Sequence, residues 1–189
     1  MGFKPRPLTG PRVVAFLRAI NVGGRRVKND ELRAIFESAG LRGVETFIAS
    51  GNVLFHPPPL SVADLEAKLE AQLHKRLGYV VDTFVRTTPE LQDIAASTPF
   101  GVIERSPQGN VLSVAFARDV IGDSAQRNLA SLCGPVDALC AVGRESYWLR
   151  RRDVGESELA SGQLERTLGV PCTARNMNTI DRLLDKLSG

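Results

Sequence analysis

The order of strand and helix patterns constrains this chain most, because the same order occurs twice. In the first half, strand patterns at residues 13–18, 44–49, 53–55 and 80–86 alternate with two helix patterns. Short apolar runs bounded by turn residues indicate the strands, and apolar residues spaced i, i+3, i+4 and i+7 indicate the helices. This half therefore predicts the order βαββαβ.

The helices of this half carry boundary signals. Asn29 is expected to cap the first helix, which Gly40 ends, and Ser61 is expected to cap the second, which Gly78 ends. Pro89 then opens a short additional helix, because proline fits the first helical turn.

The second half repeats the order and adds a terminal helix. Its four strands are expected at residues 111–117, 136–142, 146–150 and 171–175. One helix begins at Asp123, which forms a capping-box pair with Gln126, and another covers residues 156–168. Residue identity between the halves is slight, so the predicted repeat concerns element order alone.

Two βαββαβ runs predict an α+β protein of two ferredoxin-like (α/β-plait) units, each an antiparallel sheet with two helices on one face. The predicted parts are a flexible N-terminal extension (1–11), a first unit (12–97), a connection (98–110) and a second unit with the C-terminal helix (111–189). Strands apolar on both faces predict that the helix-free side of the first sheet is also covered, with the other half as one candidate.

Composition limits the class of protein. The net charge of +3 and the 24% of charged residues fit a globular protein with an anionic ligand, and they are far from a nucleic-acid-coating surface. No apolar run approaches the ~20 residues of a membrane span. Cys133, Cys140 and Cys172 form no C-x-x-C pair, which favours buried cysteines that act as small hydrophobic side chains in a reducing cytoplasm over a disulfide or zinc site. Cys172 is the weak candidate nucleophile among them.

The first polar motif follows an apolar strand that runs straight into Arg18. The chain then turns through Asn21, Gly23 and Gly24 and continues into basic residues that include Lys28. Adjacent glycines let backbone N–H groups face a ligand without intervening side chains, and nearby cations favour a negative ligand. The segment predicts a site for an anionic group such as phosphate.

Topology is expected to bring a second loop to the same place. In a ferredoxin-like unit the end of the first strand and the hairpin between the second and third strands share one edge, so Ser50, Gly51 and Asn52 should lie beside the first motif. We call this edge, built from residues 18–28 and 50–52, the rim. Turn chemistry alone explains the same residues, with Arg18 paired to Asp30 or Glu31.

The second half ends a strand in a related motif. Thr173, Arg175, Asn176, Asn178 and Thr179 surround a helix start, where free N–H groups and the helix dipole attract anions. Plain capping is the alternative.

Two other basic points favour a structural interpretation. Arg86 ends the fourth strand in the same way as Arg175 and is expected to sit on a carboxylate. Arg150, Arg151 and Arg152 are expected to form a solvated strand end.

The standard motifs of catalysis are missing from the sequence. It contains no Walker A loop, no G-x-G-x-x-G, no H-E-x-x-H, no G-x-S-x-G and no clustered metal ligands, so neither a cofactor nor a metal is expected. His56 and His74 have no neighbours that suggest a triad. Whether the protein is an enzyme stays open.

These motifs together resemble a bacterial family catalogued as domain of unknown function 1697. The resemblance is carried by the motifs L-R-x-I-N-V-G-G from Leu17, T-x-I-x-S-G-N-V-x-F from Thr46, R-T-x-x-E-L from Arg86, Pro99-Phe100, and T-A-R-N-x-N-T from Thr173. It spans nearly the whole chain past Pro11 and implies a repeated ferredoxin-like fold, with no activity attached.

The chain departs from the family pattern at four positions. Ala19 stands where glycine is usual, Asn29 where methionine is common, and Met177 replaces a tryptophan. Glu158 replaces a lysine, which reverses a charge and puts any anion-binding role of that segment in doubt.

Three functions fit these observations. The first is a cytoplasmic protein that binds a small anionic or phosphorylated ligand at the rim. The second is a module for RNA or single-stranded nucleic acid, which the 6% of aromatic residues and the missing RNA-binding signature disfavour. The third is a protein–protein interaction module, with a homodimer as one form, that assembles through sheet edges and takes no ligand.

Overall fold

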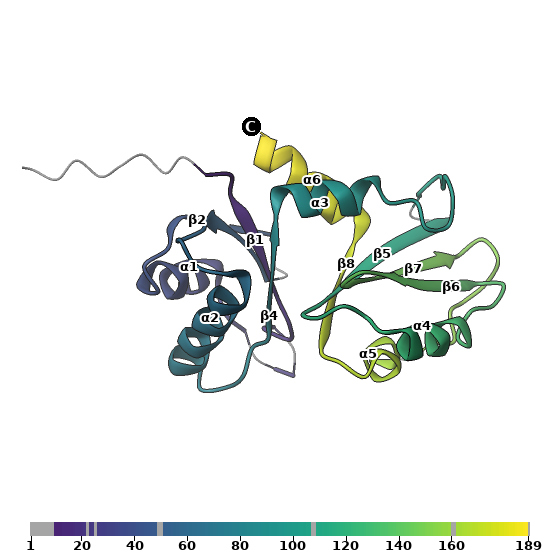
Figure 1. The fold of residues 1–189 in the computed structure, drawn as a ribbon, viewed down its shortest axis with the longest axis horizontal. Helices are drawn as coiled ribbons and strands as arrows, with labels where there is room; N and C mark the ends of the chain where they lie inside the picture. The colour runs from purple at the N-terminus through teal and green to yellow at the C-terminus, as the bar shows by residue number, and fades with distance from the viewer. Residues whose placement is uncertain are drawn as a thin grey trace, which may run out of the picture. The chain divides into compact units, whose positions relative to one another are not determined.

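Each half of the chain forms one antiparallel four-stranded sheet (Figure 1). The computed structural model describes residues 10–21, 23–24, 26–48, 51–106, 109–159 and 162–188. The chain divides into two compact units, Met1–Pro89 and Glu90–Gly189, so the short third helix and the segment after it group with the second sheet. Most of the predicted N-terminal extension lies outside the described residues.

The first unit has the predicted order. Its elements are β1 (Val13–Leu17), α1 (Asn29–Ser38), β2 (Arg42–Phe47), β3 (Asn52–His56), α2 (Val62–Leu77) and β4 (Thr83–Thr87). The strands lie in the order β2-β3-β1-β4, and both helices cover one face of the sheet (Figure 1). The ferredoxin-like α+β fold is confirmed.

The second unit repeats this arrangement. Its elements are α3 (Thr88–Ala96, which begins just before the division), β5 (Asn110–Ala117), α4 (Asp123–Ala130), β6 (Asp137–Val142), β7 (Glu145–Arg151), α5 (Gln163–Leu168), β8 (Cys172–Asn176) and α6 (Met177–Ser188). The strand order is β6-β7-β5-β8, with α4 and α5 on one face and α3 and α6 on the other (Figure 1).

Helix starts follow the sequence only in part. The Ser61 Oγ accepts a hydrogen bond from the Asp64 N–H at 3.1 Å, which confirms the predicted cap of α2. The predicted cap at Asn29 is wrong, because Asn29 is already helical and Lys28 occupies the capping position without a side-chain hydrogen bond. The capping box at Asp123 is wrong for the same reason, since Gly122 precedes the helix.

The helix predicted over residues 156–168 begins only at Gln163. A tertiary contact explains the difference. The Ser157 Oγ donates to the carboxylate of Asp137, with distances of 3.0 and 2.9 Å to its two oxygens, and so ties this segment to β6. A side chain bound to a distant strand outweighs local helix propensity.

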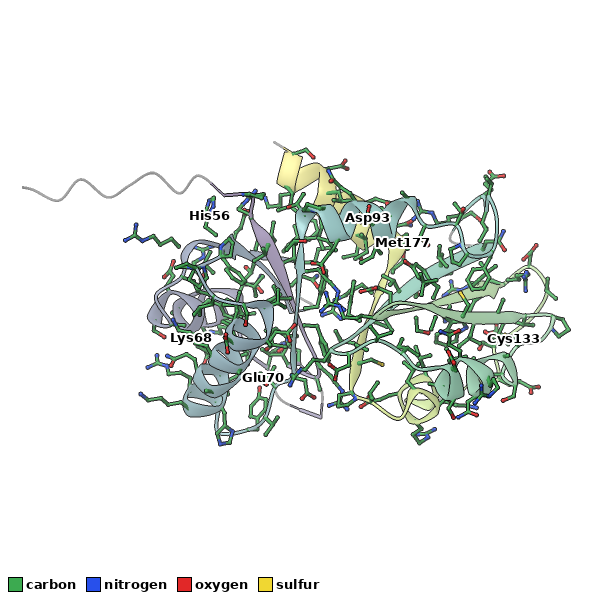
Figure 2. The ribbon with its side chains drawn as sticks, in the orientation of Figure 1. His56, Lys68, Glu70, Asp93, Cys133 and Met177 are labelled. Carbon is green, nitrogen blue, oxygen red and sulfur yellow. The ribbon has the colours of Figure 1, made fainter. Side chains whose placement is uncertain are left out.

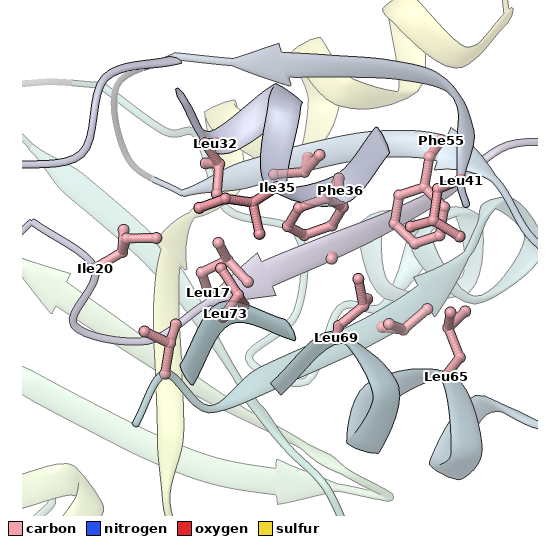
Figure 3. Packing of buried hydrophobic residues seen from close by; sticks show 14 of the residues in the cluster. Leu17, Ile20, Leu32, Ile35, Phe36, Leu41, Phe55, Leu65, Leu69 and Leu73 are labelled. Carbon is pink, nitrogen blue, oxygen red and sulfur yellow. The ribbon is translucent and has the colours of Figure 1, made fainter. Parts of the chain in front are cut away.

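The core of the first unit lies between the sheet and its two helices. Figure 3 shows Ile35 and Phe36 of α1 and Leu69 and Leu73 of α2 packed over Leu17 of β1. The rings of Phe36 and Phe55 meet edge to face at a centroid distance of 5.7 Å.

The opposite face of this sheet is also buried. Val14 and Phe16 of β1, together with Leu54 of β3, are 0% exposed although none of them belongs to the helix-side cluster. Arg86 on β4 is likewise 0% exposed, and its guanidinium donates to the Val85 carbonyl at 2.9 Å. The predicted burial of both faces of β1 is confirmed.

The repeat extends to residues, further than the sequence predicted. Val14, Ala15 and Phe16 pair with Arg86, Val85 and Phe84 in one ladder, while Val114, Ala115 and Phe116 pair with Arg175, Ala174 and Thr173 in the other. The same Val-Ala-Phe segment therefore forms the central strand of each sheet, with an arginine beside its valine.

The outer edge of β4 is closed by α2. The Thr83 N–H donates to the Glu70 carboxylate at 2.9 Å, and the Val85 N–H donates to the Glu66 carboxylate at 2.8 Å. Glu70 is labelled on α2 in Figure 2. An edge strand with occupied donors cannot pair with another chain at these positions.

We expect Glu66→Leu to destabilise the protein by about 1–3 kcal/mol, because it leaves the buried Val85 N–H without its acceptor. Glu66→Gln keeps an acceptor oxygen and should cost less. Urea unfolding of the two variants measures the difference. Equal stability of both would show that the carboxylate does not support β4.

Candidate functional site

The predicted meeting of the two loops is confirmed. The Leu17 N–H at the end of β1 donates to the Gly51 carbonyl at 2.8 Å, so the β1–α1 loop and the β2–β3 hairpin share one edge. The hydroxyl of Tyr79 donates to the carbonyl of Ile20 at 3.3 Å. Ser50 lies outside the described residues.

Arg18 is held at this edge by Asp82, the residue before β4. Its guanidinium lies 3.0 Å from the carboxylate, and its backbone N–H donates to the Asp82 carbonyl at 2.9 Å. The Arg18 side chain keeps 35% of its surface exposed. Sequence analysis missed Asp82 because 64 residues separate the partners, and only the β1–β4 pairing brings them together.

The β1–α1 loop is closed by Asn21. Its Oδ1 accepts a hydrogen bond from the Val27 N–H at 2.8 Å. Gly23 and Gly24 have φ values of +64° and +81°, in the left-handed region, and both are exposed. Ala19 also has a left-handed φ of 57°, which explains why glycine suits that position.

The described residues on the hairpin side of the rim support the fold of the hairpin. Asn52 is 0% exposed, and its amide donates to the Phe47 carbonyl at 3.1 Å, so it shapes the hairpin from inside. Gly51 has a φ of +73°, and a Cβ at this position would collide with the side chains of Leu17 and Ile20. Ile48 has a φ of 58°, a strained conformation for a β-branched residue.

Positive charge is concentrated on the loop side. Arg26 and Lys28 are exposed, and neither forms an ion pair with any residue in the described part of the chain. Lys28 stands directly before α1, whose first N–H groups receive no side-chain cap. The loop side therefore combines cations, left-handed backbone and an uncapped helix start.

The second predicted motif lies in the other unit. Arg175 is half-buried, and its guanidinium donates to the Thr173 hydroxyl and to the Ala174 carbonyl at 2.8 Å. Burial lowers the pKa of Arg175 to about 10. The Asn176 Oδ1 accepts from the Asn178 N–H at 2.9 Å, which gives α6 its cap.

The Asn176 contact therefore supports the capping interpretation for part of the motif at residues 173–179. Asn178 itself is exposed and Thr179 is half-buried on the first turn of α6.

Arg150 departs from the predicted solvated strand end. Its guanidinium carbon lies 4.8 Å from the centre of the Trp148 ring, and its Nε is buried. The side chain therefore folds back along β7 over the indole.

The predicted burial of the cysteines is confirmed for Cys172 and is wrong for Cys133, which is exposed, while Cys140 is half-buried. All three thiols are free, and Cys172 is buried in the core of the second unit. Burial, with a smaller contribution from Cys133, raises the pKa of Cys140 to about 11, so this thiol stays protonated at neutral pH.

A third cluster joins α3 to the β6–β7 hairpin. The Arg144 guanidinium binds the Glu90 carboxylate, and the Tyr147 hydroxyl hydrogen-bonds to Ser97, beside a cavity of about 190 Å³. Burial raises the pKa of Tyr147, partly offset by the Ser97 hydrogen bond.

Residues 11–147 match the family model described as Protein of unknown function (DUF1697). The chain belongs to this family. No curated protein matches the chain.

A solved structure supports the fold independently. The DUF1697 chain is similar to the conserved bacterial protein SP0830 from Streptococcus pneumoniae, with 24% identity and a TM-score of 0.71 over 95% of this chain and 99% of the other. Within the described residues, no helix is long and apolar enough to span a membrane, and no three or more His, Cys, Asp or Glu side chains gather as metal ligands.

We expect Gly51→Ala to destabilise the protein more than Gly24→Ala. Both positions have left-handed φ, which costs an L-residue about 1–2 kcal/mol. A Cβ at Gly51 would also lie 2.9 Å from the Ile20 Cγ2 and 3.1 Å from the Leu17 Cβ, whereas nothing lies within 4 Å at Gly24. Thermal unfolding compares the two, and equal losses would show that the loops do not pack tightly.

Proposed function

We propose that this DUF1697 protein binds a small oxyanion, such as a phosphate or carboxylate group, on the loop side of the rim. Arg18, Arg26, Lys28 and the backbone at Gly23 and Gly24 form the contacting set. Asn21, Gly51 and Asn52 hold the two loops in place. Arg175, Asn176, Asn178 and Thr179 remain a separate candidate in the second unit.

The observation that carries the proposal is the concentration of left-handed backbone beside Arg26 and Lys28, which form no ion pair within the described residues. Ala19 and Ile48 are the two non-glycine residues with positive φ in the described chain, and they lie in the two loops of this edge. Strained backbone persists where the surrounding structure enforces it, often at binding sites. In such turns successive N–H groups form concave anion sites.

The nucleic-acid alternative lacks a stacking surface on the central strands. Phe16 and Phe55 are 0% exposed, and Phe55 packs against Phe36 in the core. Neither ring is available to a base. The interaction-module alternative loses part of its support because Glu66 and Glu70 occupy the N–H groups at the β4 edge.

We expect the double variant Arg26→Ala/Lys28→Ala to bind pyrophosphate about tenfold more weakly than the unchanged protein, as charge-assisted contacts are lost. Lys68→Ala is the control, because Lys68 is an exposed cation on α2 (Figure 2). Isothermal titration calorimetry measures the affinities. If the double variant and the control weakened binding equally, the loss of affinity would come from the lower net charge and not from contacts at the rim.

Asp82→Asn tests the role of Arg18 separately. The substitution removes the carboxylate that competes for the guanidinium, so we expect tighter pyrophosphate binding. Unchanged affinity would show that Arg18 serves only the fold. Absence of binding to the unchanged protein, together with a stable dimer in solution, would favour the interaction module.

A further inference from the structure

We propose that the second unit holds a distinct oxyanion site at the end of β7, centred on Arg150. A cavity of about 250 Å³ is lined there by Trp148, Arg150, Arg152 and Ser157 among others. Most of the lining, from Trp148 to Leu159, follows residue 147, where the family match ends.

The first observation is an unsatisfied donor. The Arg150 Nε is buried and has no hydrogen-bond partner among the described residues. A buried donor without an acceptor is costly, and few persist in folded proteins without a reason. The guanidinium of the same residue lines the cavity, where its planar N–H fork would match an oxyanion.

The second observation is that the carboxylate nearest to Arg150 along the sheet binds other donors and forms no ion pair with Arg150. Asp137 stands directly opposite Arg150 in the β6–β7 ladder. Its Oδ1 accepts from the Trp148 Nε1 at 2.7 Å, and both its oxygens accept from the Ser157 Oγ. Arg150 forms no ion pair within the described structure, and its guanidinium lies over the Trp148 ring instead.

This arrangement fixes the site before a ligand arrives. Asp137 orients the indole and the Ser157 hydroxyl, and the indole supports the guanidinium by a cation–π contact. Arg152 adds a second positive charge to the lining, and the exposed carboxylate of Glu156 lies at the same cavity. The cavity should therefore admit a compact singly or doubly charged group and disfavour a polyanion.

Space for the rest of a ligand adjoins the site. A larger cavity of about 480 Å³ shares Val136, Glu156 and Leu159 with the smaller one and is also lined by Cys133, Asp137 and Glu158. Its carboxylates would disfavour a second anionic group and favour an uncharged or cationic remainder of the ligand. Cys133 is labelled in Figure 2. The shared chemistry is an oxyanion, either free phosphate or the acidic group of a small metabolite.

The single tryptophan of the chain makes a direct test available. Because Trp148 lies under Arg150, we expect inorganic phosphate or acetate to change its intrinsic fluorescence in a saturable way. Arg150→Gln should weaken the phosphate affinity by about tenfold or more, since a charge-assisted contact is lost. Arg150→Lys keeps the charge without the planar fork and should also weaken binding.

Two controls separate this site from the rim. Arg127→Gln removes an exposed arginine of α4 and should leave the titration unchanged, as should Arg18→Gln. Thermal melts without ligand establish that each variant is folded. No saturable fluorescence change with either anion, or an unchanged affinity in folded Arg150→Gln and Arg150→Lys, would overturn the proposal. A response to acetate alone would assign a carboxylate ligand.

Discussion

The structure of each unit depends on a central strand that is buried on both faces. In the first unit β1 lies between β3 and β4, so Val13, Ala15 and Leu17 face the helices while Val14 and Phe16 are buried on the other side. A strand in this position has no freedom of register, because a shift by one residue would exchange the two faces. The loops at its end are therefore held at a fixed edge.

The second sheet repeats this constraint and uses the equivalent edge differently. The Ala117 N–H donates to the Arg144 carbonyl at 2.9 Å, as the Leu17 N–H donates to the Gly51 carbonyl in the first sheet. Where the first unit has a tightly packed glycine, the second has an arginine bound to Glu90. The same backbone hydrogen bond therefore supports a packed glycine in one unit and an ion-paired arginine in the other.

The two proposed anion sites restrain their arginines by different means. Asp82 holds Arg18 as an ion pair, so any ligand there must compete with a carboxylate. Trp148 holds Arg150 through its ring face, and Arg150 forms no ion pair within the described residues. The first arrangement favours stability of the rim, whereas the second favours a ligand, because a π face orients a cation without neutralising it.

The sequence by itself determined the order of elements, the fold class and the meeting of the two rim loops, because periodicity and turn residues act over a few positions. Tertiary structure decided the partners. Strand pairing brings Asp82 to Arg18, hairpin geometry buries Asn52, and a side-chain contact from a loop ties Ser157 to Asp137. Each of these contacts joins residues brought together by the packing of elements or by a turn geometry that short-range patterns do not encode. The roles of polar side chains therefore depended on the folded arrangement.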